Sequence, residues 1–267
     1  MNKIKICKKV KERIRHLILF DGNQVVSSGT GVIIKESGEL LTANHVIAGY
    51  PELAQPRIIA NAIGDIAQTE YSPLLFNISF DIGMAEYAKL LVIDLAILKP
   101  VQEIKKVSFM KLGDSIPPEG EEIIMAGFPD EIKPPLNFDK ILNFDNPELG
   151  KQKAQIDNFF KHFLALVMIK SGMVGSIQKV KLNSTKIDIE GFNNKEINVE
   201  GAVYWIDNAS TYGASGGPVI NSSGELIGII SEKGMTEHLD ASFPSAKIPS
   251  GSTMALSHKL ITWFFHK

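Results

Sequence analysis

Residues 213–221 read GASGGPVIN, in which one hydroxyl, that of Ser215, has two small residues on each side. A serine is a poor nucleophile until a base takes its proton, and the oxyanion formed on attack needs preorganised N–H donors. Because Gly213 has no side chain, the backbone can turn the N–H groups of Gly213 and Ser215 into one concavity. The stretch therefore predicts a nucleophilic serine beside an oxyanion hole. The alternative is a flexible glycine turn without chemistry.

The best base for this serine is His45, in LLTANHVIAG (40–49), where an apolar run ends in one imidazole before a turn. The chain has six histidines, and none of the other five has a comparable setting. They lie in a strand pattern, in an insertion, or in polar and terminal stretches: His16, His162, His238, His258 and His266.

Asp94, in LLVIDLAILK (90–99), is the best carboxylate to orient that histidine, since apolar residues flank it on both sides. A buried carboxylate is costly without a partner, and an imidazole that becomes positively charged during catalysis supplies one. A solvent-facing aspartate at a strand edge is the alternative.

Short apolar and β-branched runs bounded by Gly, Asn, Asp, Ser and Pro fill most of the chain, so we expect a mostly β protein. The turn residues in FDGNQ (20–24), ESGE (36–39) and NSSGE (221–225) predict three β-hairpins.

Residues 130–165 interrupt this pattern with three prolines, at positions 134, 135 and 147. Apolar residues at helical spacing follow the prolines: Ile156, Phe159, Phe160, Phe163 and Leu164. We expect an inserted loop and helix between two β halves.

The charge of the chain gives no general attraction to nucleic acid, since the formal net charge of the 267 residues is -2. The first fifteen residues are basic, with seven Lys or Arg against one Glu. We interpret them as a solvated approach to the first strand, with a polyanion or membrane-surface contact as the alternative.

Cys7 is the single cysteine, so the chain cannot form an intramolecular disulfide, and a metal site built on several thiolates is excluded. The N-terminal stretch lacks the apolar region of a secretory signal, and FFKHFLALVMI (159–169) is too short and too polar to span a membrane. A cytoplasmic location is the expectation.

With these residues in view, the chain resembles a trypsin-fold serine protease, closest in pattern to the HtrA/Deg-like branch. The resemblance rests on SGTGVII (28–34), LLTANHV (40–46), DLAILK (94–99) and GASGGPVINSSGELIGI (213–229). Four further stretches match as well: KLGDS (111–115), GEEIIMAGFP (120–129), SGMVGSI (171–177) and MALSHKL (254–260). The order His, Asp, Ser is that of this family and differs from the orders in subtilisins and α/β-hydrolases.

The resemblance implies two six-stranded antiparallel β-barrels with a short C-terminal helix. Residues 1–129 would carry His and Asp, residues 166–267 would carry the serine, and 130–165 would be the insertion. It further implies that Ser215 is the nucleophile, His45 the general base and acid, and Asp94 the group that fixes the imidazole tautomer. Gly213 and Ser215 would supply the oxyanion N–H groups, and Ser231 would support the aspartate on the strand that pairs with substrate.

The implied activity is hydrolysis of peptide bonds in proteins, without a metal or an organic cofactor. Two alternatives remain open, a peptide-binding pseudoprotease and an esterase-like hydrolase of the same fold. HtrA-like enzymes usually carry Asn before the nucleophile and an upstream Asn-Pro pair, where this chain has Ala214, Thr211 and Tyr212. The chain ends soon after the second half, so a PDZ domain is not expected. The insertion at 130–165 is a candidate docking site for a regulatory partner, and the alternatives are a lid, a substrate-selecting flap, or a helix that packs on the barrels to cover its own apolar face.

The family pattern also indicates the primary specificity pocket, formed by DNASTYGA (207–214) and IISEKG (229–234). Gapless counting back from Ser215 puts the pocket floor at Ala209, with Ser231, Glu232 and Lys233 on the facing strand. Since Ala209 has no charge, we expect cleavage after small or medium aliphatic residues. Asp207 or Glu232 would favour cleavage after Lys or Arg if either lined the floor instead.

Overall fold

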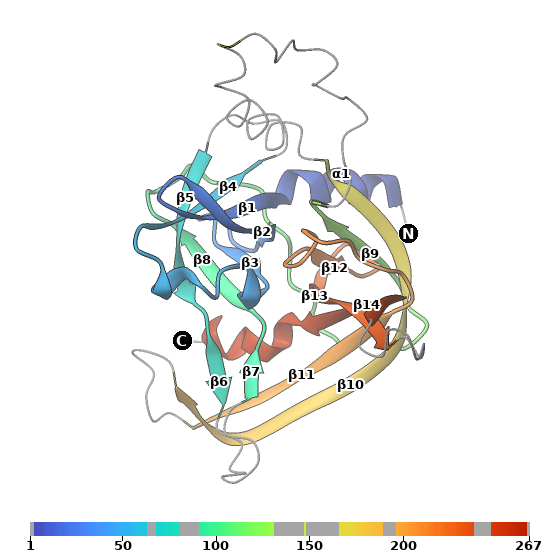
Figure 1. The fold of residues 1–267 in the computed structure, drawn as a ribbon. Coiled ribbons are helices and arrows are strands. Elements are labelled where there is room, and N and C mark those ends of the chain that lie inside the picture. Colours follow the sequence, from blue (N-terminus) through green and yellow to red (C-terminus); the bar gives the residue numbers. More distant parts are fainter. Residues whose placement is uncertain are drawn as a thin grey trace.

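A computed structural model describes residues 3–62, 68–80, 91–130, 147, 166–188, 196–237 and 247–265. It consists of two rings of antiparallel strands with a helix near each end of the chain (Figure 1). The expected insertion at 130–165 lies outside the described residues, apart from Asp130 and Pro147.

The basic N-terminal stretch forms a helix, α1 (Lys3–Arg13), which leads directly into the first strand at Ile14. Its lysines are exposed, as expected of a solvated approach, but the helix and the two residues that it buries were not predicted. Ile6 and Val10 are four residues apart, so they lie on one face of the helix, and both are buried in the main core. The lysines between them occupy the other faces, which is how a strongly basic segment can still pack.

The first ring is a closed six-stranded barrel in the order β1-β2-β3-β8-β5-β4, as predicted. Its strands are β1 (Ile14–Asp21), β2 (Gln24–Ile33), β3 (Leu40–Thr42), β4 (Pro56–Asn61), β5 (Gln68–Leu75) and β8 (Ala96–Pro100). The two hairpins predicted here are confirmed: β1–β2 and β2–β3 turn at Gly22 and Gly38, both with positive φ.

The second ring follows the order β11-β14-β13-β12-β9-β10, and pairing of β10 with β11 closes it (Figure 1). Its strands are β9 (Glu122–Gly127), β10 (Met168–Asp188), β11 (Glu196–Ile206), β12 (Pro218–Ile220), β13 (Leu226–Glu237) and β14 (Lys247–Ser257). The third predicted hairpin, β12–β13, is also confirmed and turns at Gly224, where φ is 82°.

The expected boundary at residue 129 does not coincide with the boundary between the sheets. Strand β9 lies before it and pairs with β10 and β12. A hairpin of β6 (Ile78–Phe80) and β7 (Leu91–Ile93) also lies before it, and β6 pairs with the far end of β10. Asp94 follows directly on β7, so this hairpin delivers the carboxylate where the two sheets meet.

The expected C-terminal helix is η4 (His258–Phe265), a 3₁₀ helix that follows β14. Leu260 and Ile261 of η4 are buried in the same core cluster as Val199 of β11. Within the described ranges, no helix has the length and apolar character needed to cross a membrane.

Candidate active site

Ser215 lies in the connection between β11 and β12, residues 207–217, which we term the serine loop. Gly213 and Gly216 have φ of 83° and 84°, a region that only glycine adopts at little cost. A Cβ at Gly216 would also collide with the Thr30 carbonyl and the Thr42 hydroxyl, and one at Gly213 with the Phe128 carbonyl. Both glycines are therefore required by the backbone path and by close contact, Gly216 with the first barrel and Gly213 with the segment that follows β9.

His45 lies in a short 3₁₀ turn, η1 (Asn44–Val46), just after β3. Its backbone N–H donates to Asp94 Oδ1 at 2.8 Å, and its ring Nδ1 lies 2.9 Å from Asp94 Oδ2 and 3.1 Å from Oδ1. An ionised carboxylate only accepts hydrogen bonds, so Nδ1 carries the proton. Nε2 of the neutral ring is left as the acceptor.

Asp94 is partly buried, with 24% of its side chain exposed, and it also accepts a hydrogen bond from the Ser231 hydroxyl. Burial acts to raise the pKa of Asp94, but the hydrogen bonds and charge of His45 and the bond from Ser231 outweigh it, so the pKa is lowered. The hydrogen bond to Asp94 raises the pKa of His45 against the opposing effect of burial, and the charges of Asp94 and Glu232 raise it further.

Asn44, in the same turn as His45, is joined to Asn77 by two hydrogen bonds. The Asn44 amide donates to Asn77 Oδ1 at 2.9 Å, and the Asn77 backbone N–H donates to Asn44 Oδ1 at 2.7 Å. Asn77 has a φ of 49°, a conformation that asparagine tolerates better than most residues. This pair was not predicted from the sequence, although Asn44 is adjacent to His45.

His45 and Ser215 line one cavity of about 330 Å³. Among the described residues, no hydrogen bond joins Ser215 Oγ to His45; instead Oγ donates to the Ser231 carbonyl at 3.2 Å. Catalytic hydrogen bonds are often loose before substrate binds, and one rotamer change at Ser215 alters the direction of Oγ. The structure thus gathers His45, Asp94, Ser215 and Ser231, with the serine hydroxyl turned toward the strand.

This arrangement agrees with the comparisons with known proteins. The trypsin-like peptidase domain matches residues 29–229, which is most of the chain. The chain belongs to this family. Serine protease HTRA2, mitochondrial, from Drosophila virilis and from Drosophila grimshawi is 26% identical to it over 226 residues. The match covers 82% of this chain but only 38% and 37% of those proteins, so the chain spans less than two-fifths of their length.

Solved structures show the same fold. The HtrA-type protease AlgW with a tripeptide has a TM-score of 0.56 at 19% identity, covering 100% of this chain and 63% of that one. An inactive form of Rv3671c from M. tuberculosis H37Rv has a TM-score of 0.54 at 13% identity, covering 98% and 88%. Deg5 has a TM-score of 0.51 at 16% identity, covering 86% and 84%.

In this member of the trypsin-like peptidase family, the cavity beside Ser215 includes three of the four residues expected at the specificity pocket. It is lined by His45, Ser210, Thr211, Tyr212, Ser215, Ser231, Glu232, Lys233 and Met235. Ala209 is not among them, and its carbonyl accepts a hydrogen bond from Lys170 Nζ at 2.6 Å. Asp207 Oδ1 accepts from the Met173 N–H at 2.6 Å.

Two residues that line this cavity form a cation–π contact, which was not predicted from the sequence. Lys233 Nζ lies 4.0 Å from the centre of the Tyr212 ring, so residues from the two walls of the cavity meet. Both residues lie in segments that the family pattern assigned to the pocket. Their pairing could not be read from the sequence, because it depends on how the serine loop faces β13.

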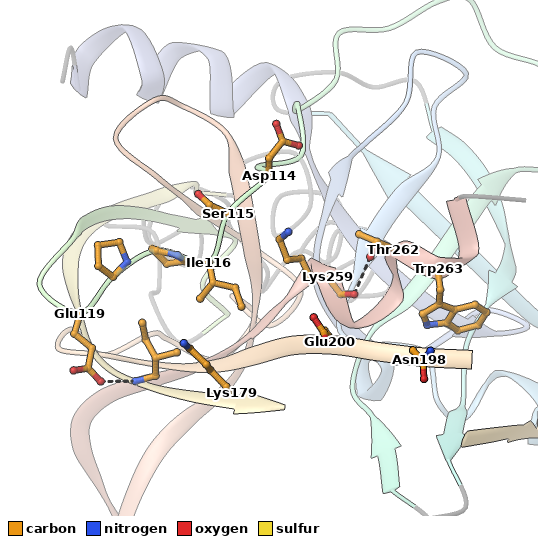
Figure 2. Close-up of a pocket in the computed structure, with 13 residues that line it drawn as sticks. Asp114, Ser115, Ile116, Glu119, Lys179, Asn198, Glu200, Lys259, Thr262 and Trp263 are labelled. Atoms are coloured by element: carbon orange, nitrogen blue, oxygen red, sulfur yellow. Dashed lines mark hydrogen bonds between the residues drawn. The ribbon is translucent and has the colours of Figure 1, made fainter. Parts of the chain in front are cut away.

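The structure has a second and larger cavity, of about 1020 Å³, which none of His45, Asp94 and Ser215 lines. Figure 2 shows it between the 114–119 segment, strands β10 and β11, and helix η4. Its lining mixes acidic and basic groups with apolar ones: Asp114, Ile116, Glu119, Lys179, Glu200, Lys259 and Trp263. Of these three residues, His45 and Ser215 line the smaller cavity.

Proposed function

We propose that the chain is a serine endopeptidase that cleaves proteins through an acyl-enzyme on Ser215. The observation that carries the proposal is the hydrogen-bonded set of His45, Asp94 and Ser231 in contact with the cavity that also contains Ser215. A carboxylate bound to Nδ1 fixes the imidazole tautomer in which Nε2 can take a proton.

In the first step, Ser215 Oγ turns toward His45 Nε2, gives it its proton and attacks the carbonyl carbon of the scissile bond. The negative oxygen of the tetrahedral intermediate accepts hydrogen bonds from the Gly213 and Ser215 N–H groups. The C–N bond then breaks as His45 returns the proton to the leaving amine. In the second step, His45 takes a proton from water as the water oxygen attacks the carbonyl carbon of the ester. The bond from that carbon to Ser215 Oγ then breaks as His45 returns the proton to Oγ, and the carboxylic acid product leaves.

The hydrogen bonding of the serine loop supports this oxyanion hole. The Tyr212 carbonyl accepts from the Asp130 N–H at 2.9 Å, and the Ala214 carbonyl accepts from the Gly217 N–H at 2.8 Å. In a trans peptide the C=O and the following N–H point in opposite directions. The N–H groups of Gly213 and Ser215 therefore point away from those two partners.

We propose further that the peptidase cleaves after small or medium aliphatic residues. Lys233 and Tyr212 narrow the cavity, and a lysine there disfavours a cationic substrate side chain. Glu232 also lines the cavity, and its carboxylate favours the alternative, cleavage after Lys or Arg. Cleavage-site profiling of a denatured proteome tests this preference, and cuts mainly after Lys and Arg would contradict it.

A fluorophosphonate probe with mapping of the labelled residue tests the activity itself. We expect label on Ser215 in the wild-type chain and none in Ser215→Ala. Turnover of denatured casein alongside a simple ester separates the alternatives, because a pseudoprotease turns over neither and an esterase only the ester.

A further inference from the structure

Thr30 of β2 connects the first barrel to the serine loop through a completely buried side chain. Its hydroxyl donates to the Gly213 carbonyl at 2.9 Å and accepts from the Phe128 N–H at 3.0 Å. Its backbone N–H donates to the Ser215 carbonyl at 2.8 Å. One residue of the first barrel thus bonds to both residues whose N–H groups form the proposed oxyanion hole.

The three successive peptide groups around these residues each have a bound carbonyl. The carbonyl of Tyr212 is held by Asp130 and that of Ala214 by Gly217, while the carbonyl between them, of Gly213, is held by the Thr30 hydroxyl. The middle bond is the only one of the three donated by a side chain. It can therefore be removed by a substitution without changing the backbone.

The middle peptide also has the weakest intrinsic restraint. Gly213 has a φ of 83°, and glycine visits positive and negative φ with similar ease. Rotation about φ of Gly213 turns the peptide that carries the Gly213 carbonyl relative to the Gly213 N–H. It would therefore move the Ser215 N–H, two residues further on, relative to the Gly213 N–H, and glycine itself opposes this rotation little. A hydrogen bond from a buried and fully packed hydroxyl supplies the missing restraint, because breaking it leaves a buried carbonyl unpaired.

We propose that Thr30 is a positioning residue for catalysis, whose hydroxyl holds Gly213 so that the oxyanion hole is formed before substrate arrives. This inference rests on the proposed endopeptidase activity. The Thr30 hydroxyl does not touch the substrate; it acts through the Gly213 carbonyl and, through Phe128, fixes the end of β9 against the same loop.

The test compares Thr30→Val, which keeps the shape and removes the hydroxyl, with Thr30→Ser, which keeps the hydroxyl. Losing one oxyanion donor lowers kcat about 10²- to 10³-fold, so loss of a group behind the donors should lower kcat roughly 10- to 100-fold in Thr30→Val. We expect KM to stay within about threefold, because the interaction is made mainly in the transition state. Thr30→Ser should restore kcat to within about threefold of wild type, and the rate of fluorophosphonate labelling should follow kcat.

Tyr71→Phe is the matched control, since the buried Tyr71 hydroxyl donates to the Gly38 carbonyl at 3.1 Å within the first barrel. It removes one buried hydrogen bond away from the serine loop, so it should lower the melting temperature but not kcat. A Thr30→Val enzyme with the kcat of Tyr71→Phe would overturn the proposal, as would equal losses in the valine and serine variants.

If Thr30→Val does not fold, Thr30→Ser and Thr30→Ala form a second pair that differs by the hydroxyl alone, and only alanine should lose kcat. Failure of both the valine and the alanine variants to fold would also overturn the proposal, since the hydroxyl would then serve folding. Failure of the proposed activity is distinct from all these outcomes, because the wild-type chain would then neither cleave casein nor take up the probe.

Discussion

The two halves of the site are held in place by different kinds of contact. Around His45, side chains supply the contacts: Asp94 accepts from His45 and from Ser231 of β13, and Asn44 and Asn77 bond to each other beside the histidine. On the second barrel, the serine loop is fixed through its backbone carbonyls and by glycines with positive φ. Substitutions in the first half should alter proton transfer, and those in the second should alter the shape of the oxyanion hole.

The largest effect is expected where the two halves meet, at the proton passed from Ser215 to His45. Ser215→Ala and His45→Ala should each lower kcat for peptide hydrolysis by about 10⁴- to 10⁶-fold, and the double variant should be no slower. The residues act as one unit, so the second substitution has nothing left to remove. A double variant much slower than either single one would show that the halves act independently.

The next largest effect is expected from a substitution that changes only the side-chain contacts of His45. Asp94→Asn should keep the fold and lower kcat by about 10⁴-fold, because an amide favours the imidazole tautomer that cannot accept the serine proton. Ser231→Ala is the control: it removes one of the donors to Asp94 but leaves the carboxylate and its bonds to His45. Near-normal kcat in Asp94→Asn would mean that another acid orients the histidine.

A smaller effect is expected from a substitution that changes only the backbone path of the serine loop. Gly213→Ala places a Cβ against the Phe128 carbonyl and the Asp130 N–H at a positive φ, so the loop must shift. We expect kcat to fall about 10²- to 10³-fold, as on loss of an oxyanion donor, and the free energy of unfolding to fall by about 1–3 kcal/mol. Kinetics and thermal unfolding measure the two.

Gly120→Ala is the control that separates the cost of a positive φ from the cost of a Cβ that collides with neighbouring atoms. Gly120 has a φ of 87°, and a Cβ there meets nothing within 4 Å. This variant should lose stability through the same backbone penalty and keep its kcat. If Gly213→Ala kept its kcat as well, the oxyanion hole would not depend on the path of the serine loop.

The same contrast explains what the sequence could predict. Turn residues at Gly22, Gly38 and Gly224 identified the three hairpins, and the motifs around His45 and Ser215 identified the double barrel, because both signals are local. Helix α1 was not predicted because most of its residues are charged. The spacing of four between Ile6 and Val10 was the signal that could have revealed it.

Contacts between distant segments could not be predicted. Thr30 lies inside a quoted motif, but as a β-branched residue it also fits an ordinary strand, and its partner Gly213 is 183 positions away. The path near Ala209 is set by Thr253, whose hydroxyl accepts from the Ser210 N–H and donates to the Asn208 carbonyl, both at 2.6 Å. Counting residues back from Ser215 cannot reveal that contact, so it could not fix the position of Ala209 relative to the cavity.

The smallest effect is expected from Glu232→Gln, which changes the charge near His45 but leaves the hydrogen bond between His45 and Asp94 in place. It tests whether a residue of the second barrel influences the pKa of His45. Glu232 belongs to the second barrel, yet its charge helps to raise the pKa of His45 above 6.5. Activity requires the neutral ring, so kcat/KM should fall as pH drops through this raised pKa. In Glu232→Gln one of the raising charges is gone, the pKa of His45 is lower, and the acid limb should move to lower pH.

Glu36→Gln is the control for this shift, since Glu36 pairs with Lys106 on the exposed surface and is not among the groups that act on His45. Its pH profile of kcat/KM should coincide with that of the wild type at the same ionic strength. Higher salt should narrow the difference between wild type and Glu232→Gln, because salt screens the charge of an exposed carboxylate. An acid limb that stays in place in Glu232→Gln would mean that the bond to Asp94 alone sets the pKa of His45, and that the second barrel contributes only shape.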